Sequence, residues 1–412
     1  MKPNPGLTLH IKDRLRWYWW VLLILLLSLA CYALAVWIVG SMDYHNNNND
    51  FFTFWLAGHM ITRAGSPYDT AQWLAGYHLF DIRYIPNPAF LYPLPLALLL
   101  APLGLLPFHS AYVFWVALTQ LMIVACLVIL LAMETNPRGK FFFIPLLIGI
   151  MLFRPTSLTL TQGQVSGLFL FALVWIAFLW HKGRWFWGGF LLGLLALKPN
   201  LGFIIILLVA IWLVLNKNWR TLCGTLIAGI ITLVAGLIYN PAWVVQYLHV
   251  GSNKLAETFG GSPTIWGLGA LISHNQITAT LIFGSLTGLL ILFGFFRVLL
   301  SAHATMLPVD VVALAVCVTL LVTPYTWTYD QLLLILPLTS AILAMDRIGI
   351  RFVLTTGVFL AIDVLAVILL IFDTLLQVEI WNVLVPLAVF GLCLVYLTRR
   401  IPSGNLEAVS KS

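Results

Sequence analysis

Long apolar runs recur along the whole chain and restrict its fold more than any other feature. Residues 18–40, 111–133 and 352–372 are each long enough to cross a bilayer, which takes about 20 apolar residues. Charged residues make up only 8% of the chain, against about 25% in a soluble domain. The runs do not alternate as the strands of a membrane barrel do. We therefore expect an all-α, polytopic membrane protein embedded in the lipid bilayer.

The basic residues indicate topology. They stand singly or in pairs between apolar runs, so the net charge of +7 does not point to nucleic acid. The arrangement that leaves 16 of the 21 Lys and Arg on the cytoplasmic side has about 12 spans in one domain, residues 1–412. It predicts a cytoplasmic N-terminus (1–16) and tail (399–412) in the cell membrane. It also predicts a large first outer loop (42–90) and a re-entrant or short Pro-rich element (91–107).

The first outer loop contains an isolated carboxylate, Asp50, between an Asn run and an aromatic cluster. A partly desolvated carboxylate there could take a proton from a substrate hydroxyl. The alternative is that Asp50, Asn48 or Asn49 caps a helix that begins near Phe51. Residues 51–64 read as an amphipathic helix lying in the membrane interface, and the Gly65–Asp69 stretch breaks it.

Other outer loops add cations, a second carboxylate and aromatic rings. The cations Arg63, Arg154 and Lys198 could neutralise a phosphate leaving group. For Arg154 and Lys198, snorkelling at a helix end is the alternative. Residues 323–331 contain Asp330 and several aromatic side chains, among them Trp327 and Tyr329, which could stack on a sugar or form an interfacial belt.

Two further patterns limit the chemistry. There is no P-loop, no Gly-rich nucleotide cradle, no DxD pair and no metal-type cysteine spacing, so we expect neither a metal nor a cofactor. Asp363 lies in the middle of a span. It is either functional or a protonated residue between helices, and we leave it out of the site.

Several short elements occur in a recognisable order. They are Asp50 to Gly58, Gly65-Ser66-Pro67-Tyr68-Asp69, Tyr92-Pro93 through Leu105-Leu106-Pro107-Phe108, Gly163-Gln164, Leu197-Lys198-Pro199 and Thr323-Pro324-Tyr325-Thr326-Trp327. On these elements the chain resembles glycosyltransferase family 87 of the GT-C superfamily, the type that uses polyprenol-phosphate-mannose. It departs from the family pattern at Tyr329-Asp330, where many members have His.

The resemblance implies a GT-C-type bundle and an outer-face active site with Asp50 as the general base. The reaction would be an inverting transfer of a hexose, in this family mannose, from a polyprenyl-phosphate donor to a lipid- or glycan-linked acceptor. Around the donor phosphate and sugar we expect Arg63, Tyr68, Arg154, Gln164, Lys198, Trp327, Tyr329 and Asp330. A transporter or flippase of a lipid-linked sugar, and a glycan polymerase or ligase, are the alternatives.

Overall fold

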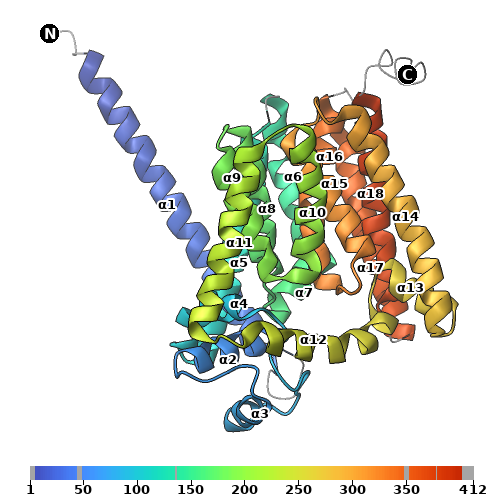
Figure 1. The fold of residues 1–412 in the computed structure, drawn as a ribbon. Coiled ribbons are helices and arrows are strands. Elements are labelled where there is room, and N and C mark those ends of the chain that lie inside the picture. Colours follow the sequence, from blue (N-terminus) through green and yellow to red (C-terminus); the bar gives the residue numbers. More distant parts are fainter. Residues whose placement is uncertain (1–4, 44–48, 135–136, 348–351, 377, 401–412) are drawn as a thin grey trace.

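The computed structural model describes residues 5–43, 49–134, 137–347, 352–376 and 378–400. Residues 1–4, the predicted tail beyond residue 400, and the segment containing Asn48 lie outside this set. Within it, every regular element is a helix (Figure 1). The elements, with 3-10 segments labelled η, are α1 (Pro5–Gly40), α2 (Asp50–Ile61), α3 (Thr70–Leu79), α4 (Leu94–Gly104), α5 (Phe108–Ala132), η1 (Pro137–Phe142), α6 (Phe143–Leu152), α7 (Arg154–Gln162), α8 (Ser166–His181), α9 (Trp185–Leu194), η2 (Leu195–Leu197), α10 (Pro199–Leu215), α11 (Trp219–Tyr239), α12 (Trp243–Thr258), η3 (Phe259–Gly261), α13 (Ile265–Ile272), α14 (Ile277–Ala302), α15 (Pro308–Val322), η4 (Thr328–Leu334), α16 (Ile335–Arg347), α17 (Phe352–Leu376), η5 (Ile380–Val383) and α18 (Leu384–Arg400).

Most of these helices are suited to a bilayer. Seven helices in the described part of the chain are long and apolar enough to cross a membrane, or eight if the bent pair of Lys140–Leu152 and Arg154–Gln162 forms one span. Five shorter apolar helices have 10–17 residues. The predicted polytopic helical membrane protein is thus confirmed, while the figure of about 12 spans stays a prediction.

The helices form one bundle with two distinct ends (Figure 1). Helices α2, α3, α4 and α12 gather at one end, here called the α2 end, and α12 lies across it. Helix α1 leaves the bundle at an angle. Its first residues and the last residues of α18 both lie toward the end opposite α2. This agrees with the predicted placement of both termini on one side, and which side that is stays a prediction.

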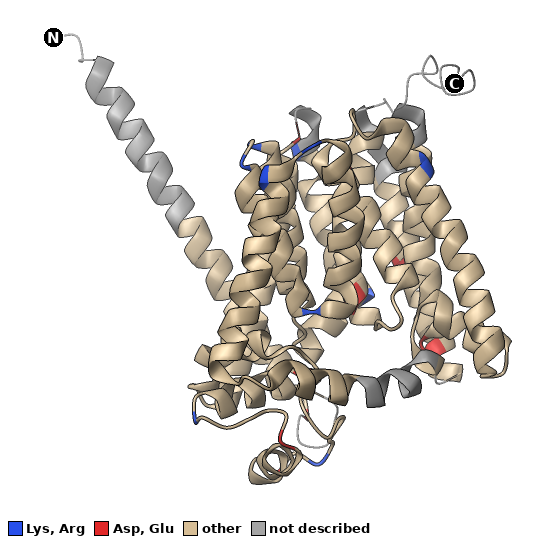
Figure 2. Ribbon diagram, viewed as in Figure 1, with Lys and Arg blue, Asp and Glu red and all other residues tan. Residues whose placement is uncertain are grey.

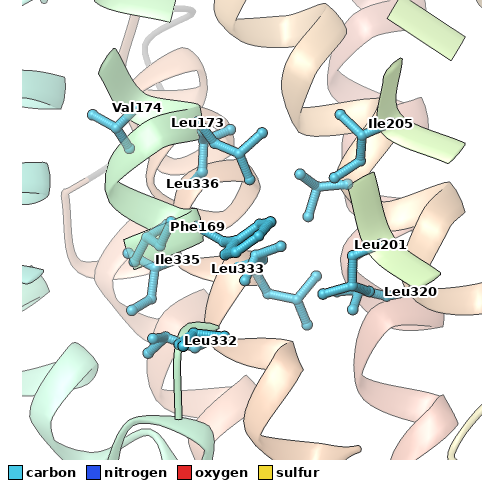
Figure 3. Close-up of a cluster of buried hydrophobic side chains, with 14 of the residues drawn as sticks. Phe169, Leu173, Val174, Leu201, Ile205, Leu320, Leu332, Leu333, Ile335 and Leu336 are labelled. Carbon is cyan, nitrogen blue, oxygen red and sulfur yellow. The ribbon is translucent and has the colours of Figure 1, made fainter. Parts of the chain in front are cut away.

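The centre of the bundle is a layer of fully apolar side chains (Figure 3). Phe169 and Leu173 of α8 meet Leu201 of α10 there, together with Leu320 of α15 and Leu333 of η4, and all five are buried. Because η4 and α16 run through this centre, 94% of the span Thr328–Met345 is buried. The core therefore fixes η4, whose first residues face the cavity described below.

Helix α2 differs from its prediction. The helix exists, but ten of its residues are buried, so it does not lie amphipathically in the interface. Its sequence is apolar on all sides, which is typical of a buried helix. The Pro-rich segment covers it with α4, which has only 11 residues and is thus a short element, as predicted.

The contact between α2 and α4 requires two glycines. A Cβ at Gly104 would come within 2.4 Å of the Gly58 carbonyl carbon, and one at Gly58 within 2.7 Å of the Leu100 oxygen. The two backbones can approach this closely only because neither glycine has a side chain. This contact fixes α2, and the Asp50 at its start, against the bundle.

Candidate active site

A cavity of about 900 Å³ opens at the α2 end. Helices α2, α7, α10 and α12 line it, together with η3, η4, the loop before α4 and Glu379, which precedes η5. Its charged and aromatic lining residues are Asp50, Phe54, Tyr84, Tyr92, Lys198, Tyr247, Tyr325, Trp327, Tyr329, Asp330 and Glu379.

The carboxylate of Asp50 is not the cap of its helix. Asn49 caps α2, because its side-chain oxygen accepts a hydrogen bond from the Phe52 amide at 3.2 Å. Asp50 Oδ2 accepts instead from Gln164 Nε2 at 2.6 Å. Asn49 is therefore the helix cap, and the Asp50 carboxylate faces the cavity, where it could act on a substrate.

A sharp turn brings Gln164 to Asp50. Gly163 ends α7 in the left-handed region, with φ of 62°, and its carbonyl accepts from Trp115 Nε1 at 2.9 Å. A Cβ at Gly163 would lie 2.4 Å from the Cβ of Phe51. Both the backbone conformation and this close contact require glycine here.

The surroundings of Asp50 raise its pKa. Burial disfavours the charged form and brings the pKa to about 6, and the nearby Asp330 carboxylate acts in the same direction. The hydrogen bond from Gln164 and the charge of Lys198 oppose this rise. A carboxylate with such a pKa is still mostly ionised at neutral pH, yet accepts a proton more readily than an exposed Asp.

Lys198 and Asp330 form a buried ion pair beside this carboxylate. Lys198 precedes α10 and donates to Asp330 Oδ1, which also accepts from Ser166 Oγ at 2.7 Å. Asp330 Oδ2 accepts from Thr326 Oγ1 at 2.9 Å and from the Trp327 amide at 3.3 Å. The Lys198 side chain is only 2% exposed, so the snorkelling alternative is wrong for this residue.

Aromatic rings complete the cavity wall on the η4 side. Tyr325, Trp327 and Tyr329 all line the cavity, and Lys198 Nζ lies 5.4 Å from the centre of the Tyr329 ring. A ring so close to a cation interacts with it favourably. These residues therefore face the site, which an interfacial belt would not require.

Arg154 lies elsewhere. It begins α7 and donates to Asp373 Oδ2 of α17 at 2.5 Å and to Asn382 Oδ1 of η5 at 3.1 Å. The guanidinium is largely buried and is not among the cavity-lining residues. In this structure Arg154 bridges α17 and η5, and it does not snorkel.

Two other predicted residues are also outside the lining. Arg63 is exposed and donates to His59 Nδ1 at 2.8 Å. Tyr68 donates through its hydroxyl to the Tyr92 carbonyl at 2.6 Å, which holds the first loop against the chain before α4. The structure thus brings Asp50, Gln164, Lys198, Trp327, Tyr329 and Asp330 together and leaves Arg63, Tyr68 and Arg154 apart.

The cavity contains one carboxylate that sequence reasoning missed, Glu379. Its Oε2 accepts from Thr328 Oγ1 at 2.7 Å, and Asn382 Nδ2 donates to the same hydroxyl at 3.1 Å. Glu379 is 51 positions from Thr328, and nothing in the sequence showed that it reaches the same cavity.

Asp363 is separate from the cavity. It is buried on α17, and neither carboxylate oxygen has a hydrogen-bond partner among the described residues.

The distribution of basic residues agrees with the predicted pattern, since Lys and Arg gather mainly at the end opposite α2 (Figure 2). No three His, Cys, Asp or Glu side chains in the described ranges come close enough to hold a metal.

The fold and cavity define a polytopic helical membrane protein with a polar site at one end. The chain matches the family model of glycosyltransferase family 87 over residues 90–324, more than half of its length. It therefore belongs to that family and is a membrane glycosyltransferase. No curated protein and no solved structure matches it. Asp50 precedes the matched residues and η4 follows them, so roles at these two positions depend on the geometry.

Proposed function

We propose that the chain transfers a hexose from a polyprenyl-phosphate sugar to a hydroxyl of a lipid- or glycan-linked acceptor, with Asp50 as the general base. The Asp50 carboxylate carries this proposal. Asn49 caps the helix, so the Asp50 carboxylate is not needed as a cap. The carboxylate faces the cavity, and its pKa is about 6. General bases work best when their pKa lies near the operating pH.

In the proposed step, the acceptor oxygen bonds to the anomeric carbon while the bond from that carbon to the phosphate oxygen breaks. Polyprenyl phosphate leaves with the bonding electron pair, and attack from the opposite face inverts the configuration. The acceptor proton passes to Asp50 Oδ1. Gln164 occupies Oδ2, and Oδ1 has no hydrogen-bond partner among the described residues, so Oδ1 is free for the hydroxyl.

Lys198 is the residue best placed for the donor phosphate. It is the one Lys or Arg among the described lining residues, whereas Arg63 and Arg154 contact His59 and Asp373 elsewhere. A bound phosphate would share the ammonium with Asp330 and gain charge stabilisation as it leaves. Trp327 and Tyr329 offer aromatic faces for the sugar.

Glu379 is the proposed acceptor-binding carboxylate. Within the described chain both of its hydrogen bonds end on Oε2, which leaves Oε1 for a substrate hydroxyl. A negative charge suits a neutral sugar and repels the donor phosphate, so we assign it to the acceptor. We expect Glu379→Gln to raise the KM for the acceptor roughly 10–100-fold with little change in the donor KM. Equal changes in both KM values would remove this assignment.

The location is part of the proposal. The α2 end would face outward from the cell membrane, with both termini in the cytoplasm. The gathering of Lys and Arg at the opposite end supports it, because cytoplasmic loops are enriched in these residues (Figure 2). A polyprenyl-linked donor can be presented at that face, where nucleotide sugars are scarce.

The decisive experiment is reconstitution in liposomes with radiolabelled polyprenyl-phosphate sugars. Mannose is the first sugar to test, because the family resemblance implies this hexose. We expect label in a new glycosidic product. Label that crosses the bilayer without a new bond would indicate a flippase, and transfer only of preassembled chains would indicate a polymerase or ligase. Label retained on the donor with every acceptor tested would contradict the proposal.

A further inference from the structure

A second cavity, of about 770 Å³, lies at the end opposite Asp50. It is here called the tryptophan pocket and is formed where the α8–α9, α10–α11 and α14–α15 connections meet. Helix α10 links the two sites: Lys198 precedes it and Asn216 caps its other end, about 25 Å away at 1.5 Å per residue. The pocket therefore takes no part in the chemistry at Asp50.

Three tryptophan rings form the floor of this pocket. Trp180 stacks on Trp185 with ring centres 6.0 Å apart, and Trp212 lies 6.1 Å from Trp180. Trp212 Nε1 donates to the His303 carbonyl at 3.0 Å, which fixes the α14–α15 connection to this floor. A Cβ at Gly188 would come within 2.2 Å of Trp180 Nε1. The floor is thus a closely packed structure and not a set of loose surface rings.

Cations form the rim of the pocket. Lys217 and Arg220 line it together with His181 and His303, and the described lining residues include no Asp or Glu. Both cations are exposed, and neither forms a salt bridge within the described ranges. Arg220 lies in the first turn of α11, where the helix dipole favours an anion over a cation. An anion bound between the two side chains would satisfy both them and the helix terminus.

The backbone supports the same reading. Helix α10 ends in a Schellman motif, in which Lys217 N–H reaches the Val214 carbonyl at 2.9 Å and Asn218 N–H the Leu213 carbonyl at 2.8 Å. Lys217 has φ of 53°, in the left-handed region, where Gly or Asn is the usual choice. Strain of this kind points to a function for the side chain that is present.

We propose that the tryptophan pocket binds the phosphate head group of an anionic glycerophospholipid. Lys217 and Arg220 contact the phosphate, and the more accessible rings of Trp185 and Trp219 contact the glycerol and the first acyl carbons. The lipid source follows from the surroundings, since Trp219 beside Arg220 and Val214 on α10 both expose their apolar side chains. Basic pockets between transmembrane helices hold such head groups, and tryptophan is suited to the boundary between acyl chains and head groups.

The test is native mass spectrometry of the full chain in detergent, titrated with phosphatidylglycerol, phosphatidylcholine or inorganic phosphate. Lys217→Asn and Arg220→Gln are each expected to weaken phosphatidylglycerol binding roughly 5-fold. Asn tolerates the left-handed conformation, so the first variant keeps its fold, and melting temperatures check both. The control is Lys182→Gln, at the same end but outside the pocket, with Nζ over the Phe178 ring.

We expect wild type and Lys182→Gln to bind phosphatidylglycerol alike and phosphatidylcholine more weakly. The proposal is overturned if the Lys217 and Arg220 variants bind phosphatidylglycerol like wild type. It is also overturned if Lys182→Gln loses as much, which would indicate a diffuse basic surface. If inorganic phosphate displaces the lipid at equal concentration, the site is one for free phosphate.

Discussion

The two cavities at the ends of this bundle use charge in opposite ways. At the α2 end, Lys198 is buried and bonded to Asp330, and the Asp50 carboxylate is held by Gln164. In the tryptophan pocket, Lys217 and Arg220 are exposed and form no ion pair within the described chain. A buried charge must be paired, whereas an exposed one is stabilised by solvent. The proposed catalytic site therefore holds its charged groups in fixed positions, and the proposed lipid site leaves its two cations exposed to a ligand charge.

The largest effect is expected at Asp50. Asp50→Asn removes the proton acceptor and should lower the transfer rate roughly 10²–10⁴-fold. The measurement is product formation from a radiolabelled polyprenyl-phosphate sugar. The matched control is Asp69→Asn, because Asp69 caps α3 and Asn caps a helix equally well. Near-normal transfer by Asp50→Asn would exclude Asp50 as the base.

The next effect concerns the ion pair. Lys198→Met leaves Asp330 as an uncompensated buried charge and should lower the free energy of unfolding by about 3–5 kcal/mol. Adding Asp330→Asn removes both charges and should restore most of that stability without restoring transfer. Thermal unfolding in detergent measures the stability of both variants, and the radiolabel assay measures transfer. The control is Arg63→Met, at an exposed site, which should change the free energy of unfolding by no more than about 0.5 kcal/mol. A similar loss in Lys198→Met and Arg63→Met would contradict the expected difference between buried and exposed charges.

A smaller effect is expected in the pH profile. Asp50 must be ionised to accept a proton, so kcat/KM should fall about tenfold per pH unit below pH 6. The hydrogen bond from Gln164 lowers the pKa of Asp50, so Gln164→Leu should move this acid limb to higher pH. Gln162→Leu, in the same cavity wall, should leave the limb in place. A limb that stays put in Gln164→Leu would assign it to another group.

The smallest effect belongs to the opposite end. Lys217→Gly relieves the left-handed strain and should raise the free energy of unfolding by about 0.5–1 kcal/mol. The sugar-transfer rate should not change, because α10 separates this position from the cavity. A melting curve and a transfer assay on the same preparation test both statements. A loss of stability would show that Lys217 is held by contacts stronger than its backbone strain.

The sequence predicted the parts of this molecule that depend on local rules. The apolar runs indicated a helical membrane bundle, Asn49 was one of the predicted helix caps, and the prolines indicated the short α4. The approach of Lys198 and Asp330 to Asp50 was anticipated only in outline, because the charge pattern placed them on one face. Their burial could not be derived, since burial depends on which helices pack around a residue.

Long-range partners were beyond sequence reasoning. Arg154 pairs with Asp373, 219 positions away, and an isolated Arg after an apolar run does not identify its partner. Glu379 is a second example, since it reaches the cavity where Asn382 of η5 forms hydrogen bonds with η4. Helix α2 was predicted over residues 51–64 and exists at Asp50–Ile61, but its environment was wrong, because nothing local showed that α4 would cover it.

Helix α2 is held at Gly58 by its contact with Gly104, and Asp50 lies at the far end of the same helix. Eight residues of helix separate Gly58 from Asp50, about 12 Å. A tilt of α2 by about 5° about Gly58 would move the Asp50 carboxylate by about 1 Å. A misplacement of that size can lower a catalytic rate about 10²-fold. The accuracy of the proposed proton transfer therefore depends on two residues that have no side chains and lie outside the cavity lining, as well as on Gln164.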